Sequence, residues 1–145
     1  MKILLDEQVP VFFAEAIARL LPKARVDHVA NIKWKSKKDI PLYADAKTRG
    51  YTLIITNDLR QLEDPEETKA IKRSGLHHLR YRRKGRGLAA QAGSLASLVA
   101  ALPAVVEVIE SVQSQRLFLA HSLSLTQSAR VEVTDPKMDP PRYWR

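Results

Sequence analysis

Acidic residues directly follow two short apolar runs in the sequence. Asp6 and Glu7 come after the apolar residues 3–5, and Asp58 closes the Thr-Asn-Asp stretch that follows residues 53–55. Short uninterrupted apolar runs are typical of strands covered on both faces, as in a parallel sheet. Ligands bind such sheets outside the carboxyl ends of the strands. We therefore expect these three acids to lie together at that edge.

A further acid, Asp39, stands at the start of a segment whose apolar residues recur with helical spacing, which predicts a helix over residues 39–49. A helix running back from the same edge brings Asp39 within reach of the others. Gathered carboxylates repel one another unless a cation lies between them. The chain has no cysteine, so oxygen ligands are expected. The predicted Mg²⁺ or Mn²⁺ site consists of Asp6, Asp39 and Asp58, with Glu7 and Asn57 as further candidate ligands.

Such a site suits phosphodiester hydrolysis. Mg²⁺ keeps several waters, binds one or two carboxylates and takes substrate phosphate as a further ligand. A metal-bound water can then attack the phosphate, and no nucleophilic side chain is required. Asp6, Asp39 and Asp58 are the predicted catalytic residues in this sense.

The same residues also have structural explanations. Asp39 could simply cap its helix and Asp58 could start a turn, since Asp is favoured at both places. Asp6 is harder to explain in this way, because a carboxylate next to a buried strand is unfavourable without a partner. His77 and His78 are adjacent in a predicted strand and face opposite ways, so they do not share a metal.

The charge balance points to a polyanionic partner. The 145-residue chain has a net charge of +8, and its basic residues gather in two runs that each contain an aromatic residue, Trp34 or Tyr81, available to stack on a base. One such run alone would be read as a solvated loop. The predicted RNA-binding residues are Lys33, Lys35, Lys37, Lys38, Arg60, Arg80, Arg82, Arg83, Lys84 and Arg86.

The order of apolar patterns predicts a three-layer α-β-α fold around a mainly parallel sheet. Strands are expected at residues 3–5, 26–29, 53–55 and 76–81, separated by helices at 10–22, 39–49 and 64–75. The first helix should bury Phe12, Phe13, Ala16, Ile17, Leu20 and Leu21. A last helix begins near Leu88 and is expected to bend or break at Pro103.

The end of the chain is predicted to be a short β and irregular tail, with alternating segments at residues 117–121 and 129–133. We place a catalytic domain at residues 1–112 and an extension, part of the same domain or a tail, at 113–145. The first apolar run is too short for a signal peptide, and residues 87–106 lack the continuous apolarity of a membrane span. A cytoplasmic protein without membrane contact is expected.

The segments "MKILLDEQVP" and "KWKSKKDIPLYADAKTRGYTLIITNDLRQL" resemble the compact PIN-like nucleases related to VapC-type toxins of bacterial toxin–antitoxin pairs. The resemblance covers about residues 1–85. It implies an endoribonuclease toxin whose metal site comprises Asp6, Asp39 and Asp58, with Thr56 shaping the acidic turn. It also implies a cognate antitoxin as a partner, and a homodimer is a further expected assembly. Many relatives carry another Asp where this chain has Arg60, and the candidates to replace it are Asn57, Asp64 and Glu67.

Three other readings remain open. A phospho-acceptor receiver domain also places an acidic pair after its first strand and an Asp after its third, although the expected hydroxyl residue and Lys after later strands are missing. A non-catalytic nucleic-acid-binding or antitoxin-binding module fits the Arg60 departure. A haloacid-dehalogenase-type phosphatase fits less well, because Gln8 stands where its second Asp is expected.

Overall fold

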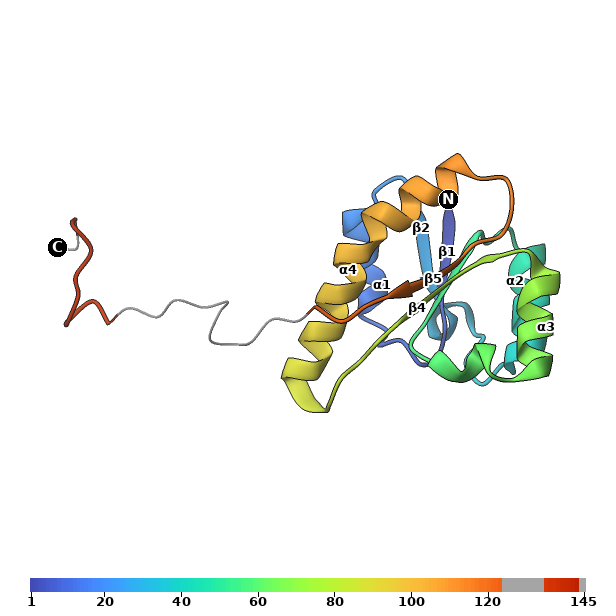
Figure 1. Cartoon of the computed structure of the whole chain (residues 1–145), viewed down its shortest axis with the longest axis horizontal. Helices are drawn as coiled ribbons and strands as arrows, with labels where there is room; N and C mark the ends of the chain where they lie inside the picture. Colours follow the sequence, from blue (N-terminus) through green and yellow to red (C-terminus); the bar gives the residue numbers. More distant parts are fainter. Residues whose placement is uncertain (124–134, 144–145) are drawn as a thin grey trace.

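The centre of the structure is a five-stranded sheet in which all neighbouring strands run parallel (Figure 1). The computed structural model describes residues 1–123 and 135–143. The strands lie in the order β2-β1-β3-β4-β5. Their bounds are β1 Lys2–Leu5, β2 Arg25–His28, β3 Leu53–Thr56, β4 His77–Tyr81 and β5 Leu117–Ala120.

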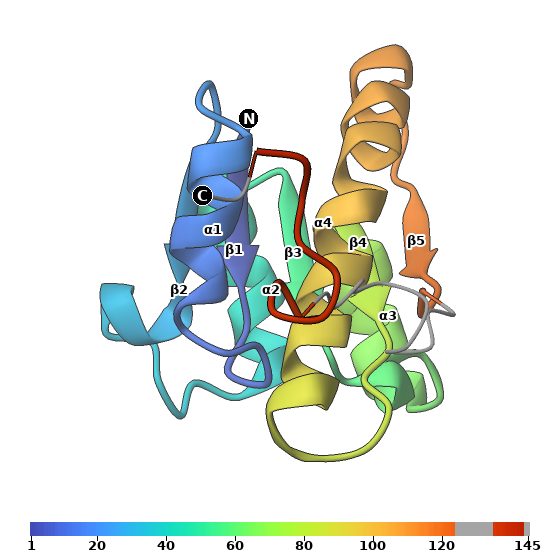
Figure 2. The same ribbon diagram turned by 90° about the vertical axis from the view of Figure 1, so that its left-hand side faces the viewer.

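Helices cover both faces of this sheet. The helices α1 and α4 lie on one face, and α2 and α3 lie on the other (Figures 1 and 2). The predicted three-layer α/β class with a parallel sheet is therefore confirmed. The helical bounds are α1 Phe13–Leu20, α2 Asp39–Thr48, α3 Pro65–Ser74 and α4 Gly87–Ser111, with short 3₁₀ helices η1 Val29–Ile32 and η2 Leu59–Leu62.

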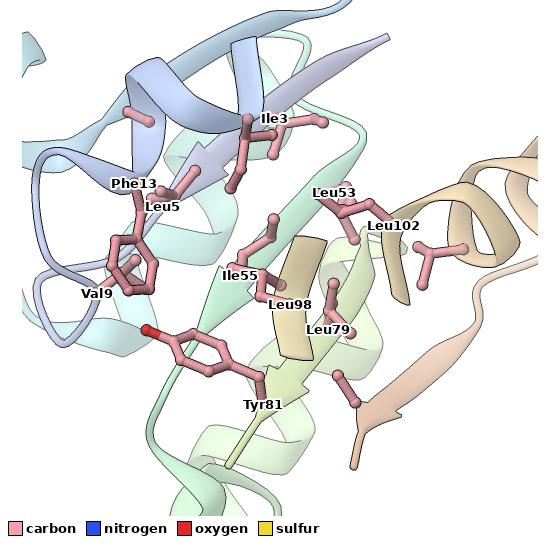
Figure 3. Close-up of a cluster of buried hydrophobic side chains, with 14 residues drawn as sticks. Ile3, Leu5, Val9, Phe13, Leu53, Ile55, Leu79, Tyr81, Leu98 and Leu102 are labelled. Carbon is pink, nitrogen blue, oxygen red and sulfur yellow. The ribbon is translucent and has the colours of Figure 1, made fainter. Parts of the chain in front are cut away.

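Residues of the central strands alternate between two buried clusters. Ile3, Leu5 and Ile55 point to the α1/α4 side, where they pack with Phe13 and Leu98 (Figure 3). The intervening residues pack on the α2/α3 side in a second cluster, which comprises Leu4, Val29, Leu42, Tyr43, Ala46, Tyr51, Ile54, Ile71 and Leu76. A strand with helices on both faces needs apolar residues at every position, which explains the uninterrupted runs in the sequence.

Local sequence signals account for both ends of α3. The side chain of Asp64 accepts a hydrogen bond from the Glu67 amide at 2.8 Å, and Pro65 follows as the first helical residue. Gly75 ends α3 in the left-handed conformation, with φ of +70°. The helix α2 begins at Asp39, as predicted.

The predicted first helix differs at its start. The segment before Phe13 forms a tight turn, because the amide of Phe13 bonds to the Pro10 carbonyl and that of Ala14 to the Val11 carbonyl. As a result the predicted buried face is partly wrong. Phe12 is 51% exposed and Leu20 is 40% exposed.

The helix α4 runs from Gly87 to Ser111 without a break at Pro103. Pro103 lies on the exposed side, where water can hydrate the carbonyl that loses its helical partner. By length and composition α4 is the one helix of residues 1–123 and 135–143 that is apolar enough to cross a membrane, and about 28% of its most apolar window is buried. Residues 87–106 carry no charge.

The C-terminal extension contributes to the sheet. The predicted segment at residues 117–121 forms β5, which pairs with β4 from His78 to Tyr81. The other predicted segment, 129–133, lies outside the described residues. Residues 135–143 contain a turn in which the amides of Met138 and Asp139 bond to the Asp135 carbonyl.

Two glycine substitutions should have opposite effects on stability. Gly75→Ala places a side chain at φ of +70°, so we expect the free energy of unfolding to fall by about 1–2 kcal/mol. Gly93→Ala lies inside α4 with open space around the added carbon, so we expect a gain of about 0.5–1 kcal/mol. Urea denaturation measures both. Equal effects would contradict the assigned backbone conformation of Gly75.

Candidate active site

A pocket of about 660 Å³ opens at the carboxyl ends of the central strands. The strand order reverses direction between β1 and β3, which is where open α/β sheets bind ligands. Lys37, Lys38 and Trp34 line one part of this pocket. Seven acidic residues also line it: Asp6, Glu7, Asp39, Asp58, Asp64, Glu66 and Glu67. The structure therefore brings together the four acids expected from the strand ends and helix start.

Asp6 is the most buried of these acids, with 3% of its surface exposed. Its amide bonds to the Ile55 carbonyl at 3.1 Å, which continues the pairing of β1 with β3 by one residue. Burial raises the pKa of its carboxyl to about 7, and the nearby Asp39 carboxylate adds to the rise. Hydrogen bonds from Thr56, the Gln8 amide and Gln61 lower the pKa and offset part of this rise.

Thr56 shapes the turn that carries Asp58. The Asp58 amide donates to the Thr56 hydroxyl oxygen at 2.9 Å, and Asp58 Oδ1 accepts from the Arg60 amide at 2.9 Å. Asp58 thus has the turn-starting role of the structural explanation as well as a place in the pocket. The Arg60 side chain is largely exposed and 3.7 Å from Asp58, so this ion pair contributes little. Asn57 does not line the pocket.

The structural explanation of Asp39 is not supported. The N-cap of α2 is Lys38, without a side-chain cap, and Asp39 follows it in the first helical turn and lines the pocket. Burial raises the pKa of Asp39, and the Asp58 and Glu7 carboxylates raise it further. Burial likewise raises the pKa of Glu67, with Asp39 next in effect. The acids therefore destabilise one another's charged forms.

The donor set fits a hydrated hard cation. Within residues 1–123 and 135–143, no three His, Asp or Glu side chains lie close enough to hold one metal ion together. A closed cage is therefore not preformed. Mg²⁺ needs only one or two carboxylates, however, and retains waters that reach further acids. Asp6, Asp39 and Asp58 provide oxygen ligands only, and a cation between them would relieve the repulsion at Asp39.

Gln61 lines the pocket and was not expected from the sequence. It is 2% exposed, and its Nε2 donates to Asp6 Oδ2 at 3.3 Å. Its Oε1 accepts from Tyr43 and His78. Burial lowers the pKa of His78 to about 4, so this histidine is neutral and part of the core. The "LRQL" stretch does not predict that Gln61 is buried beside Asp6, because a single Gln next to an Arg is usually exposed.

The basic residues have several locations. Lys37 and Lys38 line the pocket, and Lys37 also pairs with Asp45. Among the remaining predicted RNA-binding residues, Lys33 and Lys35 are exposed on the loop between η1 and α2. Arg60 is exposed shortly after Asp58, and Arg80 is half-buried in β4. The exposed loop between β4 and α4, which leaves the same edge of the sheet, contains Arg82, Arg83, Lys84 and Arg86.

The two aromatic residues expected to stack on a base differ in availability. Tyr81 is fully buried in the core beside Phe13, so the expectation for Tyr81 is wrong (Figure 3). Strand alternation turns it inward, whereas its neighbours in sequence are the half-buried Arg80 and the exposed Arg82. Trp34 lies on the pocket wall, with the cations of Lys37 and Arg49 within about 5.1 Å and 4.9 Å of its ring.

Comparisons with protein-family models, curated proteins and solved structures found no match. The PIN-like resemblance therefore depends on the sequence segments themselves. The chemistry of the pocket provides the remaining support for a function.

Asp6 should make the stability of the metal-free protein dependent on pH. The pKa of Asp6 is higher in the folded than in the unfolded chain. Its contribution to the free energy of unfolding is therefore fully present below about pH 4 and is lost as pH rises through about 7. Asp6→Asn should remove this loss. We expect unfolding free energies in EDTA to be similar for the two proteins near pH 4, with the variant more stable at pH 8 by up to about 4 kcal/mol. Parallel pH profiles would contradict the raised pKa.

Proposed function

We propose that the chain is a Mg²⁺- or Mn²⁺-dependent endoribonuclease of the PIN-like kind that hydrolyses RNA phosphodiesters in the cytoplasm. The observation that carries the proposal is the placement of Asp6, Asp39 and Asp58 around one pocket at the reversal of strand order. Basic residues on the pocket wall and on the loop after β4 supply the complementary charge for a phosphate backbone.

The pocket residues have different proposed roles. One or two of Asp6, Asp39 and Asp58 would ligate the cation directly, and the other acids of the pocket, Glu7 and Glu67 included, would contact it through its bound waters. When bound, the cation supplies charge stabilisation at the phosphate and an activated water. Thr56 keeps the Asp58 turn in place through its hydroxyl. Lys37 and Lys38 line the same pocket and would hold phosphates next to the scissile bond.

A toxin of a toxin–antitoxin pair is the biological role that the resemblance favours. The net charge of +8 suits an antitoxin with an acidic segment as well as RNA. A small DNA-binding protein encoded in the adjacent reading frame would support this role. A homodimer is part of the same proposal.

A receiver-like phospho-acceptor is the second candidate, because the order β2-β1-β3-β4-β5 also occurs in that class of fold. The strand ends argue against it. Tyr81 is followed by Arg82 rather than a hydroxyl residue, and β5 is followed by His121 and Ser122 rather than Lys. Labelling with acetyl phosphate separates the two functions.

The proposed activity requires a divalent cation and the acids. Purified protein should cleave single-stranded or structured RNA with Mg²⁺ or Mn²⁺ and lose this activity in excess EDTA. Asp6→Asn and Asp58→Asn should each abolish cleavage while the circular dichroism spectrum stays native. Glu107→Gln, on an exposed part of α4 outside the pocket, is the matched control and should cut at the wild-type rate. Full activity in EDTA, or in both Asp variants, would overturn the proposal.

The loop after β4 should contribute electrostatically to RNA binding. Neutralising Arg82, Arg83 and Lys84 should weaken binding and flatten the slope of log affinity against log salt by roughly 0.7 for each lost phosphate contact. The control neutralises three exposed residues of α3, Lys69, Lys72 and Arg73, and so removes the same charge elsewhere. Equal slopes for the two triple variants would show that the loop makes no specific phosphate contact.

A further inference from the structure

A buried cluster of polar side chains contacts Asp6 from the α2/α3 side of the sheet. It consists of Gln61 from η2, Tyr43 from α2 and His78 from β4, and each is at most 2% exposed. We call it the Gln61 cluster. Tyr43 donates to Gln61 Oε1 at 2.7 Å, His78 Nε2 donates to the same oxygen at 3.0 Å, and Gln61 Nε2 donates to Asp6 at 3.3 Å.

The cluster fixes the direction of the Gln61 amide. Its oxygen receives two donors, so its nitrogen must face Asp6. A flipped amide would place Oε1 against the Asp6 carboxylate. It would also place the Nε2 amino group against the Tyr43 O–H and the His78 N–H, which are both donors. His78 Nδ1 is buried and has no hydrogen-bond partner in the described structure, which fits a neutral ring whose single proton lies on Nε2.

Burial of an amide, a phenol and an imidazole is unfavourable compared with an apolar core unless their hydrogen bonds are made. Tyr43 and His78 satisfy the acceptor of Gln61, and what remains is one directed N–H group beside Asp6. The other Asp6 oxygen, Oδ1, receives the Gln8 amide at 2.9 Å. Together with the Thr56 hydroxyl, three donors thus hold the Asp6 carboxylate, which has about four acceptor positions and keeps one for a further partner.

We propose that Gln61 is a positioning residue for the candidate metal site: locked by Tyr43 and His78, its amide holds the Asp6 carboxylate in one orientation toward the pocket. The part of this inference that concerns a metal rests on the proposed function, whereas the part that concerns the orientation of Asp6 does not. Removal of groups that orient metal ligands typically weakens metal affinity about 10–100-fold.

The test compares two buried or half-buried glutamines. Gln61→Met keeps the length of the side chain and removes its hydrogen bonds. Gln115→Met is the matched control, because Gln115 Nε2 donates to the carbonyls of Ile71 and Leu76 at 2.8 and 2.6 Å, away from the pocket. Calorimetry with Mn²⁺ should show affinity weakened about 10–100-fold in Gln61→Met and unchanged in Gln115→Met. Equal Mn²⁺ affinities in wild type and Gln61→Met overturn the link to the metal site.

A second variant separates orientation from space filling. Tyr43→Phe preserves the shape of the core and removes one donor to Gln61, so it should weaken Mn²⁺ binding by a smaller factor. In the Gln61→Met background, Tyr43→Phe should have no further effect, because its influence passes through the amide. Independent, multiplicative losses would overturn the locked-amide mechanism. If Gln61→Met does not fold, the Mn²⁺ affinity of Tyr43→Phe alone tests the proposal.

A metal-free readout distinguishes this inference from the proposed function. The backbone amide of Gln8 bonds to Asp6, so its proton resonance reports the position of the carboxylate. The resonance should move in Gln61→Met and stay in place in Gln115→Met. If wild-type protein binds no Mn²⁺, the proposed function fails and the Gln8 resonance alone decides the positioning role. An unmoved Gln8 resonance in Gln61→Met overturns that role.

Discussion

The burial of one carboxyl group at the end of the central strand is the constraint around which the site is built. Asp6 cannot withdraw into solvent, because its amide is part of the β1–β3 pairing and its neighbours in the strand are fully buried. The surrounding structure supplies hydrogen-bond donors from a turn, a loop amide and a buried glutamine. These offset part of the unfavourable burial, and the remainder leaves the group poised to take a proton or a cation.

The sheet and the order of its elements could be predicted from the sequence because their causes are local. Buried parallel strands need continuous apolar runs, and Asp64, Pro65 and Gly75 specify the ends of α3 within their own segment. The meeting of Asp6 and Asp58 followed from the same logic, since strand ends share an edge in a parallel sheet. Asp39 followed from the direction of its helix.

Other features depend on contacts between distant parts of the chain, which no local pattern encodes. Gln61 is buried only because η2 turns it toward Tyr43 and His78, each 17 or 18 residues away. Tyr81 lies in a run of basic residues, next to the half-buried Arg80 and the exposed Arg82, and only the alternation of β4 shows that it faces the core. The turn before Phe13 likewise shifts the buried face of α1 away from Phe12.

The helix α4 has a consequence for handling the protein in solution. At about 0.01 M salt the Debye length is about 30 Å, and the net charge of +8 keeps copies of the chain apart. At about 1 M it falls to about 3 Å, and this repulsion is lost. Residues 87–106 of α4 carry no charge, and their outer side, where Leu88 is 82% exposed, then becomes more prone to self-association. A high-salt wash that removes bound polyanions therefore favours self-association of the protein. Returning the protein to low salt restores the repulsion between its copies.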